Sequence, residues 1–225
     1  MSFGLLAHND SGDIIIDAAF QNHVIVQSGT TTISAPNDVG NASLVSFGLP
    51  SGSYYNFSLQ PLLFVRSTTK YVSFASWHFA GPNGIDGADG FVIIPDSYPV
   101  TFDWKLVVVP TAQSAETEGI RVFDANSKAV FDSGLPYLSI VDAITISDPS
   151  LGAFSHAAAT TPFYCVTSGY MFKNDISGAG NSYNSGYKAV SGTGGSSAWC
   201  SFGSSQTSSN VTLPTSAIVL VGDAG

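Results

Sequence analysis

The sequence has little charge and few of the groups on which enzymes rely. Only 10% of its 225 residues are Asp, Glu, Lys or Arg, against about a quarter in an average soluble protein. Seven basic and sixteen acidic residues give a net charge of −9, which offers no attraction to phosphate backbones or anionic membrane surfaces. We therefore expect no nucleic-acid partner.

Long apolar runs are also missing. The sequence has no window of about 18 consecutive apolar residues, so we expect no insertion into a membrane. The opening MSFGLLAHNDSGD has neither a cationic region nor an apolar stretch of signal-peptide length, which predicts synthesis in a cytosol.

Motifs for catalysis and metal binding are missing as well. The sequence contains no GxSxG nucleophile elbow, no GxxxxGK[ST] phosphate loop and no HExxH motif. Its two cysteines, Cys165 and Cys200, form no CxxC pair and have no histidine nearby. We interpret them as buried thiols, with a disulfide between them as the alternative once the protein leaves the cell. We expect neither enzyme activity nor a cofactor.

Short runs of β-branched and aromatic residues recur along the chain. Each run ends at Gly, Pro, Asn or Asp, as strands separated by turns do, and helical periodicity is almost absent. These observations predict an all-β protein built from antiparallel β-sandwich lobes, with very little helix. The runs lie at residues 23–28, 54–67, 70–80, 90–95, 101–110 and 216–222.

The run KYVSFASWHF, residues 70–79, predicts a strand without a polar face. Strict alternation places Val72 and Phe74 on one face and Trp77 and Phe79 on the other. Because neither set is polar, we expect this strand to be covered on both sides.

A polar, glycine-rich segment, GPNGIDGADGF, follows at residues 81–91. Asn83, Asp86 and Asp89 provide oxygen atoms of the kind that bind Ca²⁺, but their three-residue spacing differs from that of an EF-hand loop. Gly and Asp in such numbers are typical of a hairpin or Ω-type loop, which is the interpretation we favour.

Two stretches of the chain resemble each other: GLLAHNDSGDIIID at residues 4–17 and GIRVFDANSKAVFD at residues 119–132. Aligned without a gap, they share the first glycine, the closing aspartate and apolar residues at five corresponding positions. Short apolar runs around a polar turn predict a β-hairpin in each. Gly12 is suited to a left-handed turn position in the first hairpin, and we expect Asn126 to take that position in the second.

The segment PTAQSAETEG, residues 110–119, has few apolar residues and reads as a linker or crossover loop. It predicts a division of the chain into an N-terminal β lobe, residues 1–113, and a C-terminal β lobe, residues 114–225. Each lobe then begins with one of the two hairpins.

Residues 168–210 are dominated by Gly, Ser, Asn and Tyr. They predict long Gly/Ser-rich surface loops, because Tyr supplies rigid contact area and small residues supply adaptable hydrogen bonds at recognition surfaces. Ordinary Gly-rich strands and turns are the alternative. The candidate receptor-contact residues are Tyr170, Tyr183, Tyr187 and Trp199.

The opening MSFGLLAHNDSGDIIID and the segment GIRVFDANSKAVFDSGLPYLSIVD resemble a phrase found in small tail-tip and tail-fibre-associated proteins of tailed bacteriophages. That phrase is G-ψ-x-V-x-[DN]-x-x-G-x-x-x-[FY]-D-S, where ψ is apolar. The match covers residues 1–17 and about 119–142, and Ser127 stands where the phrase has its second glycine.

The resemblance implies a virion structural protein of the tail tip or tail fibre, assembled in the host bacterial cytoplasm and contributing to host attachment. Its partners would be other tail-tip or tail-fibre proteins and a host receptor, which is a polysaccharide, a pilus or an outer-membrane protein. A homo-oligomer is implied, with a trimer as the expected form, because repeated surfaces add weak contacts through avidity.

Two other functions fit the same sequence. A free-standing carbohydrate-binding module would also expose Tyr and Trp, because sugar rings stack on aromatic faces. A glycan depolymerase would need a pair of carboxylates across a cleft.

Overall fold

The structure is a computed structural model that describes residues 6–8, 14–17, 23–38, 42–124, 126–127, 129–146, 153–157, 159–167, 171–174, 181–190, 194–202 and 217–223. In these residues the chain forms antiparallel β-strands and one short 3₁₀ helix, η1 (Phe57–Leu59). The prediction of an all-β protein with very little helix is confirmed. Among the described residues, no helix has the length and apolar character needed to cross a lipid bilayer.

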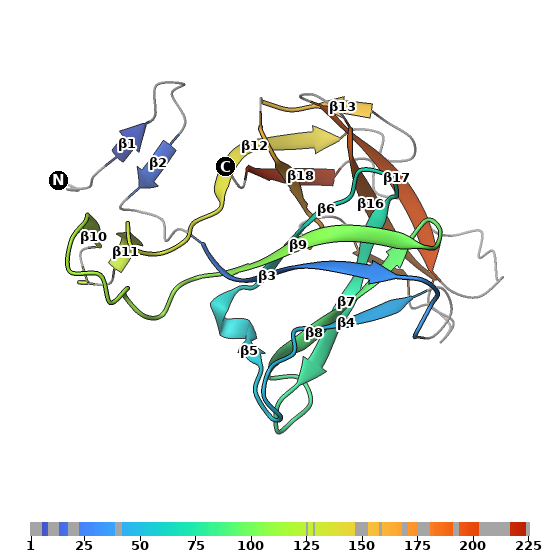
Figure 1. The fold of residues 1–225 in the computed structure, drawn as a ribbon, viewed down its shortest axis with the longest axis horizontal. Coiled ribbons are helices and arrows are strands. Elements are labelled where there is room, and N and C mark those ends of the chain that lie inside the picture. The colour runs from blue at the N-terminus through green and yellow to red at the C-terminus, as the bar shows by residue number, and fades with distance from the viewer. Residues whose placement is uncertain are drawn as a thin grey trace.

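Most strands belong to two large sheets (Figure 1). The six-stranded sheet has the order β12 (Ser139–Ile146), β18 (Ala217–Asp223), β14 (Pro162–Cys165), β6 (Leu62–Arg66), β9 (Val100–Val108) and β3 (Val24–Ile33). The eight-stranded sheet has the order β13 (Ala153–Ser155), β17 (Gly194–Phe202), β16 (Asn181–Val190), β7 (Val72–Ala80), β8 (Gly87–Pro95) and β4 (Ser43–Ser46), while β15 (Met171–Asn174) pairs with β16 and β5 (Tyr55–Asn56) with β8.

The two sheets share one apolar core, in which aromatic rings meet. Phe91 of β8 is fully buried, and its ring centroid lies 5.7 Å from that of Phe47 and 5.4 Å from that of Trp104 of β9. Rings from both sheets therefore interlock. The other side chains of this core come from alternate residues of the strands, which point to the same face of a sheet. Its buried members include Leu63, Val65, Val72, Phe74, Ile93, Phe102, Leu106, Tyr164, Val219 and Val221.

Strand β7 departs from the strict alternation that its sequence predicts. Its register with β8 shifts between Phe74 and Ser76, so that one extra residue lies in β7. Phe74 and Trp77 consequently both pack in the core, with ring centroids 5.1 Å apart, although alternation had placed them on opposite faces. Alternation of apolar and polar residues in the sequence does not predict a bulge of this kind.

Strands from both sides of residue 113 contribute to each large sheet. In the six-stranded sheet β14 pairs with β6, and in the eight-stranded sheet β16 pairs with β7. The predicted boundary between the lobes therefore does not coincide with a boundary between sheets. The predicted linker does lie outside the strands, between β9 and residue 121.

The region predicted as long surface loops, residues 168–210, contains β15, β16 and β17 in its described part. The expectation of long loops is wrong for these residues, and the alternative of Gly-rich strands holds for them. Tyr, Trp and Val favour extended backbone, and pairing with β7 and β13 places these strands inside the sheet despite their small residues.

Replacing Phe91 by Ala should lower the free energy of unfolding by about 3 to 5 kcal/mol, because it removes a buried ring where the two sheets meet. The matched control is Phe79→Ala in β7, whose side chain is 52% exposed and whose loss should cost less than about 1 kcal/mol. Urea unfolding followed by tryptophan fluorescence measures both. Equal losses in the two variants would contradict the described core.

Candidate functional site

Both predicted hairpins are present in the structure. The first consists of β1 (Leu6–His8) and β2 (Ile14–Asp17), and the second of β10 (Arg121–Phe123) and β11 (Ala129–Asp132). In the first, the pairs are Leu6 with Asp17, Ala7 with Ile16 and His8 with Ile14. In the second, they are Arg121 with Asp132, Val122 with Phe131 and Phe123 with Ala129.

The two hairpins have the same register. Adding 115 to each residue number of the first set of pairs gives the second set. The irregularity also recurs at the same place, since Ile15 in the first hairpin and Val130 in the second are the residues that the ladder skips. A β-bulge at a fixed position re-aims the strand that carries it, so both hairpins twist at the same point.

The turn of the second hairpin explains one glycine of the phage-tail phrase. The Asp124 carboxylate accepts a hydrogen bond from the Asn126 amide at 2.8 Å, and the Asp124 carbonyl accepts one from the Ser127 amide at 3.1 Å. Ser127 has a φ of 62°, a left-handed conformation for which glycine is best suited. We expected this conformation at Asn126, but the structure places it one residue later, at Ser127.

The ends of the hairpin are joined through the first glycine and the last serine of the phrase. Gly119 has a φ of 127°, and a Cβ atom there would collide with the Ser133 hydroxyl oxygen. That hydroxyl accepts a hydrogen bond from the Ile120 amide at 2.9 Å, and the Ser133 amide donates to the Ile120 carbonyl at 2.9 Å. Only glycine fits at residue 119 without displacing this contact.

Asp132 connects the hairpin to the linker. Asp132 is only 3% exposed. Its carboxylate accepts hydrogen bonds from the Ser114 amide and hydroxyl at 2.8 Å each, from Arg121 Nε at 3.0 Å and from the Gly134 amide at 3.0 Å. Arg121 also donates to the carbonyls of Ser114 and Glu116, at 2.8 and 2.7 Å. Strand, linker and following turn therefore meet at one carboxylate.

These contacts decide the protonation state of Asp132. Burial acts to raise its pKa, but the hydrogen bonds from Ser114, Gly134 and Arg121 outweigh burial and lower the pKa to about 2. A carboxylate that is ionised and occupied by four donors cannot serve as a general acid. Its role is to hold the hairpin.

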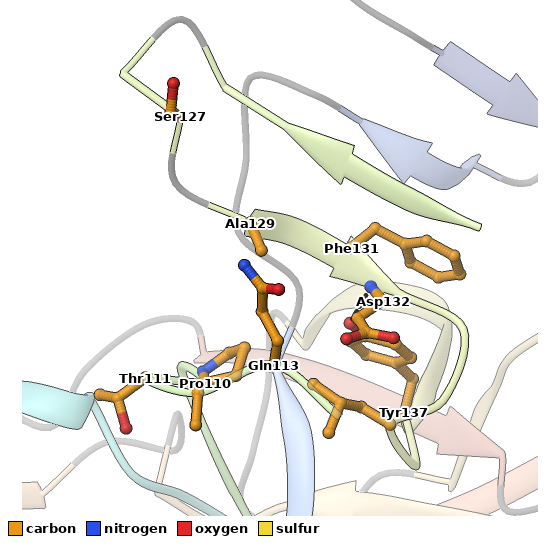
Figure 2. A pocket seen from close by; sticks show the side chains of 10 residues that line it. Pro110, Thr111, Gln113, Ser127, Ala129, Phe131, Asp132 and Tyr137 are labelled. Atoms are coloured by element: carbon orange, nitrogen blue, oxygen red, sulfur yellow. Dashed lines mark hydrogen bonds between the residues drawn. The ribbon is translucent and has the colours of Figure 1, made fainter. Parts of the chain in front are cut away.

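A pocket of about 200 Å³ lies between the linker and the second hairpin (Figure 2). Phe131 and Tyr137 stack in it, with ring centroids 5.0 Å apart and an angle of 12° between the rings. The Tyr137 hydroxyl accepts a hydrogen bond from the Asp132 amide at 2.7 Å. The remaining described residues of the lining are Pro110, Thr111, Ala112, Gln113, Ser127, Ala129 and Leu135. Among the described lining residues, Asp132 is the sole carboxylate or other strongly ionised group.

The predicted receptor-contact residues are placed by backbone register alone. Tyr170 lies outside the described residues, while β16 contains Tyr183 and Tyr187 and β17 contains Trp199. Tyr187 pairs with Val72, which is a core residue, and directly paired residues of antiparallel strands share a face.

The remaining two positions follow from alternation. Ser185 lies midway between Tyr183 and Tyr187 and pairs with Trp199. All three candidate positions therefore occupy the face of the eight-stranded sheet that Val72 shares with the core. The prediction that they contact a receptor stays a prediction.

The three calcium candidates have other partners. The Asn83 side chain donates to both oxygens of Asp86, at 3.2 and 3.3 Å, within the turn that joins β7 and β8. Asp89 instead contacts His78 Nδ1 in an exposed ion pair. The hairpin-loop interpretation is confirmed. In the described part of the chain, no group of three or more His, Cys, Asp or Glu side chains is placed to hold a metal ion.

Of the two cysteines, Cys165 is buried as predicted, and its Sγ lies 3.4 Å from the Thr167 hydroxyl. The side chain of Cys200 lies outside the described residues.

Comparisons of the chain with protein-family models, with curated proteins and with solved structures give no match.

Replacing Asp132 by Asn should destabilise the protein in a pH-dependent way. The folded-state pKa of about 2 lies below the ordinary aspartate value of 3.8, so the stability that the carboxylate contributes is fully present above about pH 4 and is lost as the pH falls towards 2. Urea unfolding at several pH values should show a gap between wild type and Asp132→Asn that closes over this window. A gap that is constant from pH 5 to pH 2 would contradict the assignment.

Replacing Ser127 by Gly should stabilise the protein by about 0.5 to 1 kcal/mol, because glycine adopts positive φ without strain. The matched control is Asn126→Gly, which changes the neighbouring turn residue and should give no such gain, since Ser127 has the left-handed conformation. Thermal unfolding of both variants checks this. If Asn126→Gly is the more stable variant, the described turn is wrong.

Proposed function

We propose that this protein is a non-enzymatic structural component of the tail of a tailed bacteriophage, located at the tail tip or tail fibre and contributing to host attachment. The observation that carries the proposal is the second hairpin. Asp132 and Ser133 hold it together by the hydrogen bonds described above, Gly119 leaves room for the Ser133 hydroxyl, and the second glycine of the phrase corresponds to the left-handed position at residue 127. The phrase thus encodes a rigid structural unit.

The second hairpin also presents apolar side chains to solvent. Ile120 is 57% exposed and Phe123 is 45% exposed, although the hairpin has its own small cluster of Val122, Val130 and Phe131. Exposed apolar residues on a rigid support are typical of protein contact surfaces. We assign this surface to contact with other tail proteins.

A free-standing carbohydrate-binding module is the second candidate. It is favoured by a group of aromatic rings at the β7–β8 hairpin, where the exposed Phe79 lies 5.8 Å from Phe57 and Phe57 lies 6.4 Å from Trp77, measured between ring centroids. Sugar rings stack on such faces. This candidate predicts a monomer that binds glycans in isolation.

Immunogold electron microscopy of phage particles tests the proposal, using an antibody shown to recognise the native purified protein. We expect gold at the distal end of the tail. Particles grown with the Ile120→Ser/Phe123→Ser variant should lose the label, because the exposed hairpin contacts are removed.

The matched control is Ile85→Ser, which removes a side chain that is 69% exposed at the tip of the β7–β8 hairpin and should leave the label in place. Wild-type particles without gold would overturn the tail assignment. Glycan-array binding by the isolated monomer would then support the carbohydrate-binding module.

A further inference from the structure

Strand β3 forms one margin of the six-stranded sheet. It pairs with β9 on one side, over pairs that run from Val24 with Val108 to Ile33 with Val100. On its other side, the described residues provide a single bridge, between Val24 and Tyr137, and a hydrogen bond from the Ile25 amide to the Pro136 carbonyl. Both contacts lie at the start of the strand. From Gln27 onwards, no described strand pairs with this edge.

The segment Gln27 to Ile33 lacks the features that usually protect a sheet edge. Its sequence, QSGTTTI, contains no charged residue and no proline, and the register irregularity of β3 lies before it, between Ile25 and Gln27. Natural proteins protect exposed edges with Lys, Pro, bulges or covering segments, because unpaired N–H and C=O groups bind a further strand. A regular, neutral, β-branched edge is therefore suited to pairing.

Three threonine side chains of this segment bond to side chains of β9. Thr30 donates a hydrogen bond to Asp103 at 2.6 Å, the Thr32 and Thr101 hydroxyls lie 2.9 Å apart, and Trp104 Nε1 donates to the Thr31 hydroxyl at 3.0 Å. These contacts hold β3 against β9. The strand does not need to rearrange before another strand adds to it.

We propose that this edge pairs antiparallel with the same edge of a second copy of the chain, joining two six-stranded sheets across a two-fold axis. The second copy is the fitting occupant because the segment is its own complement. Full overlap of residues 27–33 centres the pairing on Thr30, so Ser28 lies opposite the partner's Thr32, and Thr30 opposite the partner's Thr30. No like charges meet, although each chain carries a net charge of −9.

This inference does not rest on the proposed tail function. It follows from the open edge of β3 and holds for any function of the chain. A two-fold pairing gives a dimer, or an assembly that contains dimers, and by itself it does not give the trimer that the resemblance implies.

A pair of double variants tests both the interface and its register. Ser28→Lys/Thr32→Lys places lysine opposite lysine twice across the two-fold axis. Ser28→Lys/Thr32→Asp places lysine opposite aspartate twice. Both residues are exposed in the single chain, so both variants should fold. The two lysines also reduce the net negative charge of −9, which alone would favour association, so any loss of dimer must come from the edge.

Sedimentation analysis over about a hundredfold range of concentration should show a wild-type dimer. The lysine-lysine variant should raise the dimer Kd at least about tenfold, while the lysine-aspartate variant should retain the dimer. Hydrogen exchange should show that the amides of residues 28–33 that do not bond to β9 become protected only at dimer-forming concentrations. A wild type that stays monomeric, two variants that both stay dimeric, or two variants that both dissociate would overturn the proposed pairing. Circular dichroism confirms folding.

Discussion

The pairing of β3 with β9 is the interaction on which the rest of the structure depends. Strand β9 contributes Trp104 and Leu106 to the core between the sheets and Val107 to a second apolar cluster on the opposite face. Because the pairing is antiparallel, the start of β3 at Val24 lies beside the end of β9 at Val108. The first hairpin precedes β3 and the second follows β9, so both emerge at the same end of the sandwich (Figure 1).

The chain that returns from the second hairpin is fixed to the same strand pair. Pro136 accepts a hydrogen bond from the Ile25 amide at 2.7 Å, and Leu138 is buried against the outer cluster of the six-stranded sheet. Asp132 then fixes the hairpin to the linker that leaves β9. The second hairpin is thus connected to the sandwich through the linker and through the returning chain, which explains how its exposed residues can be presented in a defined position.

The two copies of the hairpin differ at the residues beside and after the closing aspartate. The second has Arg121 beside Asp132 and Ser133 after it, whereas the corresponding residues of the first are Leu6 and Ala18. The first copy therefore repeats the register of the second without the residues that ion-pair with the aspartate and join the hairpin ends. The repeat is one of backbone geometry.

The sequence predicted those strands and hairpins that depend on residues close together in the chain. Runs of β-branched and aromatic residues predicted β9 and β18, and the gapless alignment of residues 4–17 with 119–132 predicted two hairpins whose registers agree. The bulge in β7 and the left-handed turn at Ser127 were missed, because each adds or shifts one residue without changing composition.

Long-range pairing was beyond the sequence for a different reason. The pairing of β14 with β6 and of β16 with β7 brings together residues far apart in the chain. The sequence of each strand does not indicate which other strand it pairs with. For the candidate site, Asp132 was recognised as the closing residue of a repeat. Arg121 could have been found as its cross-strand neighbour once the hairpin was predicted, but Ser114 in the linker carries no local signal for this contact.

The central claim is that one hairpin geometry occurs twice and is placed twice at the same end of the β3–β9 pair. Cross-strand nuclear Overhauser effects in the intact, isotope-labelled protein test it most directly. The account predicts contacts between Leu6 and Asp17 and between Arg121 and Asp132, with Ile15 and Val130 skipped in the two ladders. Ladders that differ in register between the two hairpins, or that include Ile15 and Val130 as regular pairs, would contradict it.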